Sequence, residues 1–424
     1  MKLNYGKTFL LGFGFFGISV IWGVYNAFVP IFLSDKFGLA PALIGFFMTL
    51  DNIAALFIQP PVGAWSDRLR TRWGRRIPFL LVGAPVTAVA FGLIPMAAAL
   101  PLFVACTSTL LLSAALWRTP VVALMPDITP SKFRSQANGI INFMGGFGTI
   151  VALQTGGLLY KMSPSFPFWL GSVLVVIAAL VVFLFIKEPK DYEETERQPG
   201  MIDSLKEVIN DPDKSGLRIL LAIFFWFLGF SAVETFFTLY AKNHLGLNEG
   251  DGATLLSVLP LFFVLFAIPS GYVAGKIGRK TTISIGLVTI TVMLILLYIT
   301  PASALLTGIA PLPLVGIPLV EGGTRMLTLA GVLLILGGIG WAFININSLP
   351  MIVDLTNAAR IGTFTGLYYL FSTFSAIIGP NVNGWAVQLT GGDYNIIMII
   401  SPVFMLIALV MMLGVKRGEA TSSE

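Results

Sequence analysis

Three ionisable side chains lie inside long apolar stretches of the sequence, and these residues are the best placed to do chemistry. Asp51 follows Met-Thr-Leu, Arg118 lies within Leu-Trp-Arg-Thr-Pro, and Glu234 lies within Phe-Ser-Ala-Val-Glu-Thr-Phe. An ionisable group in such a setting costs roughly 2.5–3.5 kcal/mol on membrane-insertion scales. Each of the three is therefore a functional candidate.

Asp51 and Arg118 have complementary chemistry. A carboxyl group takes up and releases a proton as its surroundings change, whereas a guanidinium keeps its charge and needs a permanent partner. We therefore predict that Asp51 and Arg118 couple a proton to a conformational change. The alternatives are a structural hydrogen bond for Asp51 and a structural ion pair for Arg118. Glu234 is interpreted either as an acceptor for substrate hydroxyl groups or as a solvated surface residue.

Uncharged amides and aromatic rings within the apolar stretches complete a predicted binding surface. Amides can hydrogen-bond to a polar substrate, and rings can stack on its apolar face, although each amide alone often serves to join membrane helices. As a set they suit a neutral polyol better than a cation. The predicted substrate-binding residues are Tyr25, Asn26, Arg118, Gln154, Glu234, Trp341, Asn345 and Asn347, with Trp22 as a further ring.

Several chemistries are excluded by the residues that the chain lacks. One cysteine, Cys106, and one histidine, His244, cannot make a disulfide framework, a tetrahedral metal site or a nucleophile–histidine–acid set. No G-x-x-x-x-G-K-[ST] run indicates a nucleotide site. Basic residues lie between apolar runs rather than on one face, so the net charge of +5 does not indicate nucleic acid. We expect no enzyme activity, catalytic residue, cofactor or metal.

The elements that position these residues are predicted to be membrane-spanning helices. Hydrophobic residues make up 56% of the 424 residues and charged residues 11%, against about 25% charged in soluble domains. Apolar runs of 18 or more residues recur along the chain. Spans are predicted near 8–33, 42–65, 77–97, 101–126, 136–160 and 167–186, then near 217–242, 252–275, 280–300, 326–353, 361–388 and 394–415.

This pattern predicts an all-α membrane protein with twelve transmembrane helices in two pseudo-symmetric six-helix bundles. The bundles are expected at 1–187 and 217–424, joined by a charged cytoplasmic linker at 188–216 with a short surface helix around 201–210. Most lysines and arginines fall on one side if both termini are cytoplasmic, which fixes the predicted orientation. The stretch 301–325 is then either an extracellular loop or a re-entrant segment.

Two loop motifs recur at equivalent places in the predicted halves. Pro61-Val-Gly-Ala-Trp-Ser-Asp with a following Gly-Arg-Arg matches Pro269-Ser-Gly-Tyr-Val-Ala-Gly with a following Gly-Arg-Lys. Asp127 precedes a glycine by 12 positions, as does Asp354. This repeat indicates duplicated halves, with small residues allowing close helix packing. Charge clusters at these loops are predicted to act as a gate, or alternatively to set orientation against lipid headgroups. The predicted gating residues are Asp67, Arg75, Arg76, Asp127, Arg134, Asp354 and Arg360.

At this loop the sequence resembles the major facilitator superfamily, whose signature joins Gly-x-x-x-Asp to Gly-Arg-Arg/Lys. More narrowly, the run from Asp67 to Phe79, Asp51-Asn52, Gln59-Pro-Pro and Met125-Pro-Asp-Ile-Thr-Pro resemble the glycoside-pentoside-hexuronide cation symporters and the sucrose-type proton symporters. The resemblance implies uptake of a sugar or glycoside by two halves that rock about a central cavity. Melibiose-type members carry paired carboxylates late in the second helix, whereas Asp51 stands earlier and alone, which favours a proton over sodium.

The resemblance also implies the partners and the location. We expect a small-molecule substrate, a co-transported proton and the lipid bilayer as partners, and a monomeric multi-pass protein of the plasma or inner membrane. Sucrose-type symporters use an arginine of the fourth helix, although their Arg-to-Asp spacing is shorter than that from Arg118 to Asp127. Two alternatives stay open: a proton-coupled exporter of lipophilic compounds, which the 34 phenylalanines would suit, and a non-transporting membrane sensor.

Overall fold

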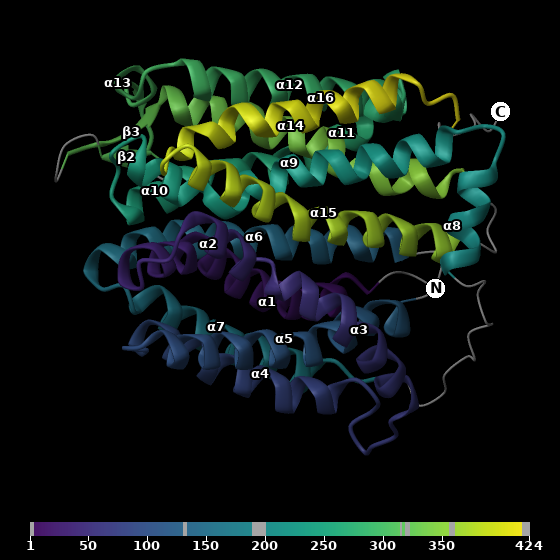
Figure 1. The fold of residues 1–424 in the computed structure, drawn as a ribbon. Helices are drawn as coiled ribbons and strands as arrows, with labels where there is room; N and C mark the ends of the chain where they lie inside the picture. Colours follow the sequence, from purple (N-terminus) through teal and green to yellow (C-terminus); the bar gives the residue numbers. More distant parts are fainter. Residues whose placement is uncertain are drawn as a thin grey trace. The chain divides into compact units, whose positions relative to one another are not determined.

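The computed structural model describes residues 4–129, 134–188, 201–313, 316–318, 323–355 and 361–417, and these are almost entirely helical (Figure 1). Within those ranges, ten helices or helix pairs are long and apolar enough to cross a membrane. Two further helices of 29 residues each, α6 and α15, carry more polar side chains. The predicted all-α membrane fold is therefore confirmed, and long helices occupy all twelve predicted positions.

The chain divides into two compact units by its internal contacts. In unit 1, α1 packs against α6 and α7, and α4 packs against α5 and α7. The helices of unit 1 are α1 (Tyr5–Ile31), α3 (Leu50–Arg68), α4 (Ile77–Leu93), α5 (Leu100–Ile128), α6 (Arg134–Met162), α7 (Phe166–Phe185) and α10 (Glu249–Leu256).

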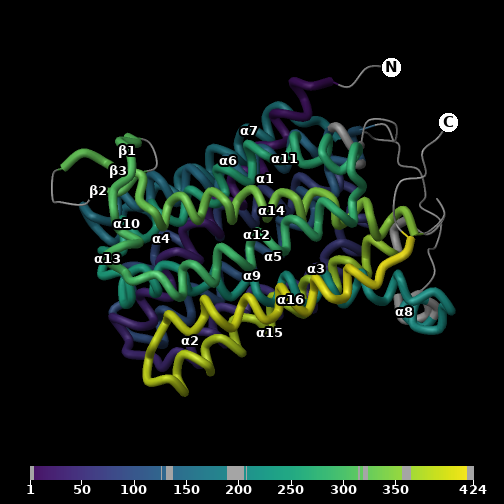
Figure 2. The backbone as a smooth tube through the Cα atoms, turned by 90° about the horizontal axis from the view of Figure 1, so that it is seen from above, coloured from purple at the N-terminus to yellow at the C-terminus, as the bar shows by residue number. Residues whose placement is uncertain are grey.

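In unit 2, α9 runs beside α15 and α16, while α11 and α12 both pack against α14 (Figures 1 and 2). The helices of unit 2 are α2 (Pro41–Phe47), α8 (Met201–Asn210), α9 (Ser215–Asn243), α11 (Val258–Ile277), α12 (Arg279–Ile299), α13 (Ala302–Leu305), α14 (Leu329–Val353), α15 (Ile361–Leu389) and α16 (Ile397–Leu413). The short helix α8 stands where the charged linker predicts one.

The second predicted span of each half is broken into two helices. The break between α2 and α3 falls at Met48 and Thr49, and the break between α10 and α11 falls at Ser257. In each, a hydroxyl donates to the carbonyl oxygen three residues earlier: Thr49 to Phe46 at 2.7 Å and Ser257 to Thr254 at 2.6 Å. Such bonds compete with the regular helical ladder. The short helix before each break belongs to the other unit: α2 to unit 2 and α10 to unit 1.

The stretch 301–325 contains short strands, which the sequence does not predict. Strands β1 (Gly308–Pro311), β2 (Ile317–Pro318) and β3 (Arg325–Thr328) form an antiparallel sheet in the order β1-β3-β2. The described residues of this stretch therefore form the four-residue helix α13 and strands that pair through their backbone groups. The strands are too short, and too rich in proline, to show an alternating hydrophobic pattern.

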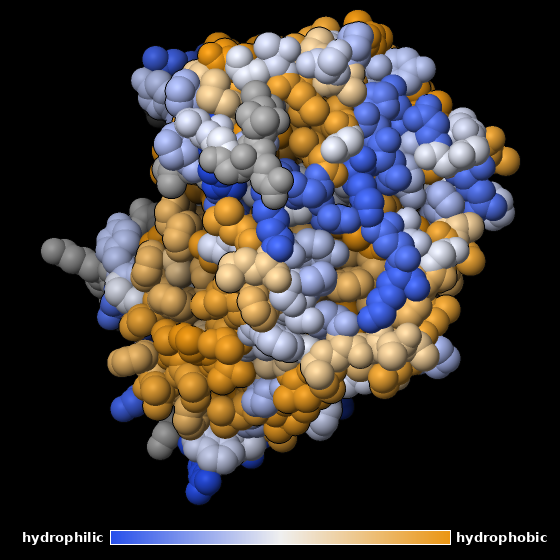
Figure 3. Space-filling model, turned by 90° about the vertical axis from the view of Figure 1, so that its left-hand side faces the viewer, coloured by the Kyte–Doolittle hydropathy of each residue, from blue (hydrophilic) through white to orange (hydrophobic). Residues whose placement is uncertain are grey.

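Hydrophobic side chains cover broad areas of the face drawn in Figure 3. On α4 the exposed residues follow one helical stripe, with Val82 at 62%, Val89 at 63% and Leu93 at 44% exposure. A stripe of exposed apolar residues on an otherwise buried helix is the pattern that lipid contact requires. The surface therefore agrees with a membrane-embedded protein.

Candidate functional site

The structure brings three of the predicted residues together in unit 1. Asp51 lies in the first turn of α3, directly after the break, and its Oδ1 accepts a hydrogen bond of 2.8 Å from the Asn52 amide. Tyr25 of α1 and Arg118 of α5 both interact electrostatically with its carboxyl group. Tyr25 is 1% exposed, and its hydroxyl has no hydrogen-bond partner among the described residues.

The break in the second span explains why Asp51 can carry a charge there. The first turn of a helix has backbone N–H groups without an intrahelical acceptor, and it favours an anion. The backbone N–H groups of Asp51 and Asn52 favour the ionised carboxylate, in addition to the hydrogen bond from the Asn52 side chain. Its ionised form is thus supported by a helix end, an amide and Arg118, within a largely apolar bundle.

Arg118 of α5 is an exposed residue. Leu102 and Leu112 of this helix are 53% and 54% exposed, as expected for residues that meet lipid. Arg118 follows Leu111 by seven positions and Ala115 by three, so it shares a helical face with these two buried residues. Val122, four positions after Arg118, is 43% exposed on the same side, so the guanidinium is accessible while it interacts electrostatically with the Asp51 carboxyl group.

In unit 2, Trp341 of α14 is the centre of an aromatic cluster. Its ring stacks on Phe230 at 3.6 Å with the planes parallel, and meets Phe227 edge-on at 5.3 Å. Phe227 also contacts Tyr368, whose hydroxyl hydrogen-bonds with Ser348 at 3.1 Å. The sequence predicted Trp341 but not its neighbours on α9 and α15, because single aromatic residues on apolar helices are indistinguishable from core residues.

The predicted amides have different surroundings. Gln154 of α6 accepts a hydrogen bond of 2.9 Å from Ser257, and buried Asn347 donates to Ser270 and to the Phe343 carbonyl oxygen, both at 2.9 Å. These two side chains take part in helix contacts, and their role toward a substrate stays a prediction. The other predicted polar residues are half-buried Asn26 and Asn345 and exposed Glu234.

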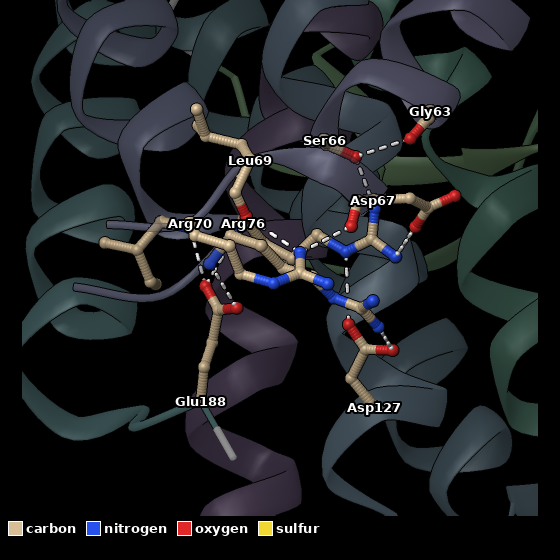
Figure 4. A network of polar contacts seen from close by, with 10 residues as sticks. Gly63, Ser66, Asp67, Leu69, Arg70, Arg76, Asp127 and Glu188 are labelled. Atoms are coloured by element: carbon tan, nitrogen blue, oxygen red, sulfur yellow. Dashed lines mark hydrogen bonds and ion pairs between the residues drawn. The ribbon is translucent and has the colours of Figure 1, made fainter. Parts of the chain in front are cut away.

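The predicted gating residues of unit 1 form a charge cluster at the ends of α3, α4 and α5 (Figure 4). Asp127 binds Arg75 at 2.7 Å and the Arg76 Nε atom at 3.1 Å. Arg76 also pairs with Asp67 at 2.5 Å and donates to the Ser66 hydroxyl. Arg76 is 5% exposed, so one buried guanidinium connects two carboxylates from two helices.

Glu188 belongs to this cluster, and sequence reasoning missed it. Its carboxylate accepts hydrogen bonds from the backbone N–H groups of Arg75, Arg76 and Ile77 at 2.8, 2.8 and 2.7 Å. It therefore caps the N-terminus of α4, where free N–H groups favour an anion. Gly74 has φ +111°, and a Cβ there would lie 2.7 Å from both Glu188 oxygens. The loop needs glycine for both reasons.

The corresponding motif of unit 2 is built differently. Arg279 at the start of α12 pairs with Asp354 at the end of α14. Ala274 and Gly275 stand where the first motif has Ser66 and Asp67, and a cavity of about 310 Å³ opens beside Gly275 and Arg279. Of the other predicted gating residues, Arg360 and the side chain of Arg134 lie outside the described residues.

Most of the chain matches one known protein family. The family model described as Major Facilitator Superfamily matches residues 11–322. The chain belongs to the Major Facilitator Superfamily. The resemblance read from the loop motif is thereby confirmed, and the family consists of membrane transporters.

The names of relatives within the superfamily indicate different transported compounds. Multidrug resistance protein 2 of Bacillus subtilis is 25% identical over 282 residues, covering 65% of this chain and 67% of that protein. The isoprimeverose transporter of Lactiplantibacillus pentosus is 21% identical over 415 residues, covering 89% of this chain and 78% of that protein. The crystal structure of a mutant nucleoside transporter, NupG, matches with TM-score 0.74 at 16% identity, covering 97% and 100% of the two chains. This last likeness concerns the fold alone.

Proposed function

We propose that this major facilitator superfamily member takes up a sugar or glycoside together with a proton, by alternating access. The observation that carries the proposal is the group of Asp51, Tyr25 and Arg118 inside unit 1. A carboxyl group between a phenol without a hydrogen-bond partner and a permanent cation has the chemistry of a proton carrier. The similarity to an isoprimeverose transporter over most of both chains supports the sugar.

In this proposal the three residues have separate roles. Asp51 binds the proton, and Arg118 stabilises the ionised carboxylate once the proton has left. Tyr25 supplies a hydroxyl that the protein itself leaves without a hydrogen-bond partner in the part of the chain described here. Burying a hydroxyl without a partner is unfavourable, so this group is available to a substrate hydroxyl. The rings around Trp341 offer a surface on which an apolar sugar face can stack.

The decisive experiment is pH-jump uptake in proteoliposomes with a panel of radiolabelled sugars. The parent protein should accumulate one sugar against its gradient when the outside is acidified. Asp51→Asn should bind and exchange that sugar but no longer accumulate it, because the amide cannot release a proton. Asp393→Asn, a change at an exposed carboxylate, is the matched control. Accumulation by Asp51→Asn at the parent level would refute the coupling role.

The second candidate is a proton-coupled exporter of lipophilic compounds. The aromatic cluster of Phe227, Phe230, Trp341 and Tyr368 favours it, as does the similarity to a multidrug resistance protein. Counterflow of a radiolabelled disaccharide and efflux of a fluorescent dye from the same proteoliposomes separate the two. Sugar counterflow without dye efflux supports uptake of sugar, and the reverse result supports export.

A further inference from the structure

Helices α6 and α10 of unit 1 meet along a close seam. Gly157 of α6 faces Gly250 of α10, and a Cβ on Gly157 would lie 2.5 Å from the Thr254 hydroxyl and against the Gly250 carbonyl oxygen. At one end of the seam Gln154 accepts the hydrogen bond of Ser257. Small residues thus bring the two backbones into direct contact.

The other end of the seam carries an ion pair. Lys161 Nζ lies 2.5 Å from an Asp251 oxygen, and the side chains are 34% and 5% exposed. Asn248 binds the second Asp251 oxygen at 2.5 Å and, through its own Oδ1, accepts the Asp251 N–H at 2.8 Å. The Asp251 carboxylate is therefore buried, oriented and neutralised by the one lysine on the opposite helix.

The repeat in the sequence provides a second seam, between α15 and α2 in unit 2. Asn381 donates to the Thr49 hydroxyl at 3.3 Å, a Cβ on Gly384 would lie 2.6 Å from the Pro41 carbonyl oxygen, and Gln388 accepts from the Ala42 N–H at 3.3 Å. The residues Asn381, Gly384 and Gln388 have the same spacing as Gln154, Gly157 and Lys161. An amide, a glycine and a longer polar side chain therefore recur in the same order.

The two seams differ at one position. Lys161 of the first seam corresponds to Gln388 of the second, and the Asp251 carboxylate corresponds to an uncharged contact with the Ala42 N–H. Breaking a buried ion pair leaves an uncompensated charge, whereas the Ala42 N–H and the Gln388 amide can exchange their weak bond for water. The first seam thus resists separation more than the second.

We propose that Lys161 and Asp251 form a latch that holds α10 on α6 and makes this seam the harder of the two to open. Lys161 follows Tyr160, which stacks on Phe28 toward the end of α1 remote from the N-terminus. With the predicted orientation, this end faces the exterior. The latch joins α6 to the short helix that leads through Ser257 into α11 of unit 2, so it opposes the separation that opens the transporter to the outside. Its strength sets how often the outward-open state forms.

The inference depends on the alternating-access part of the proposed function but not on the substrate. Its test uses the buried Ser257 at the break as a reporter: Ser257→Cys in a Cys106→Ser background, in detergent and without ligand. The quantity measured is the rate of alkylation by N-ethylmaleimide. Lys161→Ala and Asp251→Asn should each raise this rate about tenfold, as expected when a partly buried ion pair is lost.

Further variants distinguish loss of the ion pair from a general disturbance of folding. The charge swap Lys161→Asp with Asp251→Lys, and the conservative Lys161→Arg, should restore slow alkylation. Gln388→Ala, the matched change in the second seam, should leave the alkylation rate of the Ser257→Cys reporter within about twofold of the parent. Unchanged rates in the single variants, or a swap as reactive as they are, would overturn the latch. Because no substrate is present, a failure of sugar transport leaves this result intact.

Discussion

At the scale of single residues, the charge cluster depends on Arg76. Its guanidinium is buried and joins Asp67 of α3 to Asp127 of α5, with Ser66 as a third partner. Arg75 pairs with Asp127 from a slightly more exposed position. Arg76 is therefore the residue whose removal takes a partner from both carboxylates at once and leaves Asp127 with Arg75.

We predict that Arg76→Ala lowers the free energy of unfolding by roughly 1–3 kcal/mol, because Asp127 and Ser66 each lose a buried hydrogen-bond partner while Arg75 still binds Asp127. Arg72→Ala is the control, since Arg72 is exposed and lies over the Trp73 ring at 4.2 Å. That change should cost less than about 0.5 kcal/mol. Thermal unfolding in detergent measures both, and equal shifts would contradict the central role of Arg76.

Charged residues inside apolar stretches could be predicted from the sequence, because a charge in hydrocarbon is conspicuous there. Asp51 and Arg118 were found in this way, and the structure places them together. Glu188 was missed because it begins a stretch rich in charge, where one more carboxylate carries no signal. Its partners are backbone N–H groups more than a hundred residues earlier, and no local pattern indicates such a contact.

At the scale of elements, the short helices α2 and α10 are held by backbone contact. Gly157 and Gly250 lie against each other's carbonyl oxygens, and Gly384 lies against Pro41 in the same way. Glycine makes a helix less stable than alanine does. Its presence at these contacts is therefore explained by the close packing that it allows.

We predict that Gly157→Ala destabilises the protein by roughly 1–3 kcal/mol, since its methyl group would overlap Gly250 and Thr254. Gly139→Ala is the matched control on the same helix, because nothing lies within 4 Å of a Cβ there. It should be neutral or stabilising by up to about 1 kcal/mol. The measurement is the melting temperature of each variant. A Gly157→Ala protein as stable as the Gly139→Ala control would contradict the close contact between α6 and α10.

The positions of the long helices could be predicted from hydropathy, but their interruptions could not. Thr49 and Ser257 each donate to the carbonyl oxygen three residues earlier, yet Ser66 makes the same bond to Gly63 within the continuous helix α3. Tertiary packing therefore decides where a helix breaks. The small sheet near 308–328 was missed because its pairing is set by contacts between strands of two to four residues.

At the scale of the whole molecule, the segment that follows α16 is bound to the segment before α9. Arg417 forms ion pairs with Asp211 and Asp213, and its N–H donates to the Ser215 hydroxyl at 3.2 Å. The hydroxyl and N–H of Ser215, followed by Arg417, hold the pKa of Asp213 below its ordinary value of 3.8. The two carboxylates in turn raise the pKa of Arg417.

We predict that the contacts of Asp213 with Arg417 and Ser215 stop stabilising the protein in acid. A carboxyl group with a lowered pKa in the folded protein contributes stability above its unfolded pKa, and that contribution is lost as the pH falls through the folded value. The difference in melting temperature between the parent and Asp213→Asn should therefore be present at about pH 5 and should shrink as the pH falls below about 3.8. A difference that is constant down to about pH 2.5 would contradict the assignment.

The orientation in the membrane stays a prediction of the positive-inside rule. A green fluorescent protein fused after residue 424 should fluoresce, because both termini are expected in the cytoplasm. A cysteine introduced at Thr307, in the loop before β1, should react with an impermeant maleimide added to intact cells. A cysteine introduced at Arg72 should react only after the cells are permeabilised. The opposite labelling pattern would reverse the orientation.

The placement of α10 in unit 1 also has a consequence for biosynthesis. Unit 1 needs a helix that the ribosome makes only after α9, and unit 2 needs α2, which is made almost first. A nascent chain that ends after α9 therefore exposes the Gly157 and Lys161 face of α6 with nothing to cover it. Neither half can finish assembling until the other is at least partly inserted, so separately expressed halves cut at the linker should each require the other for maturation.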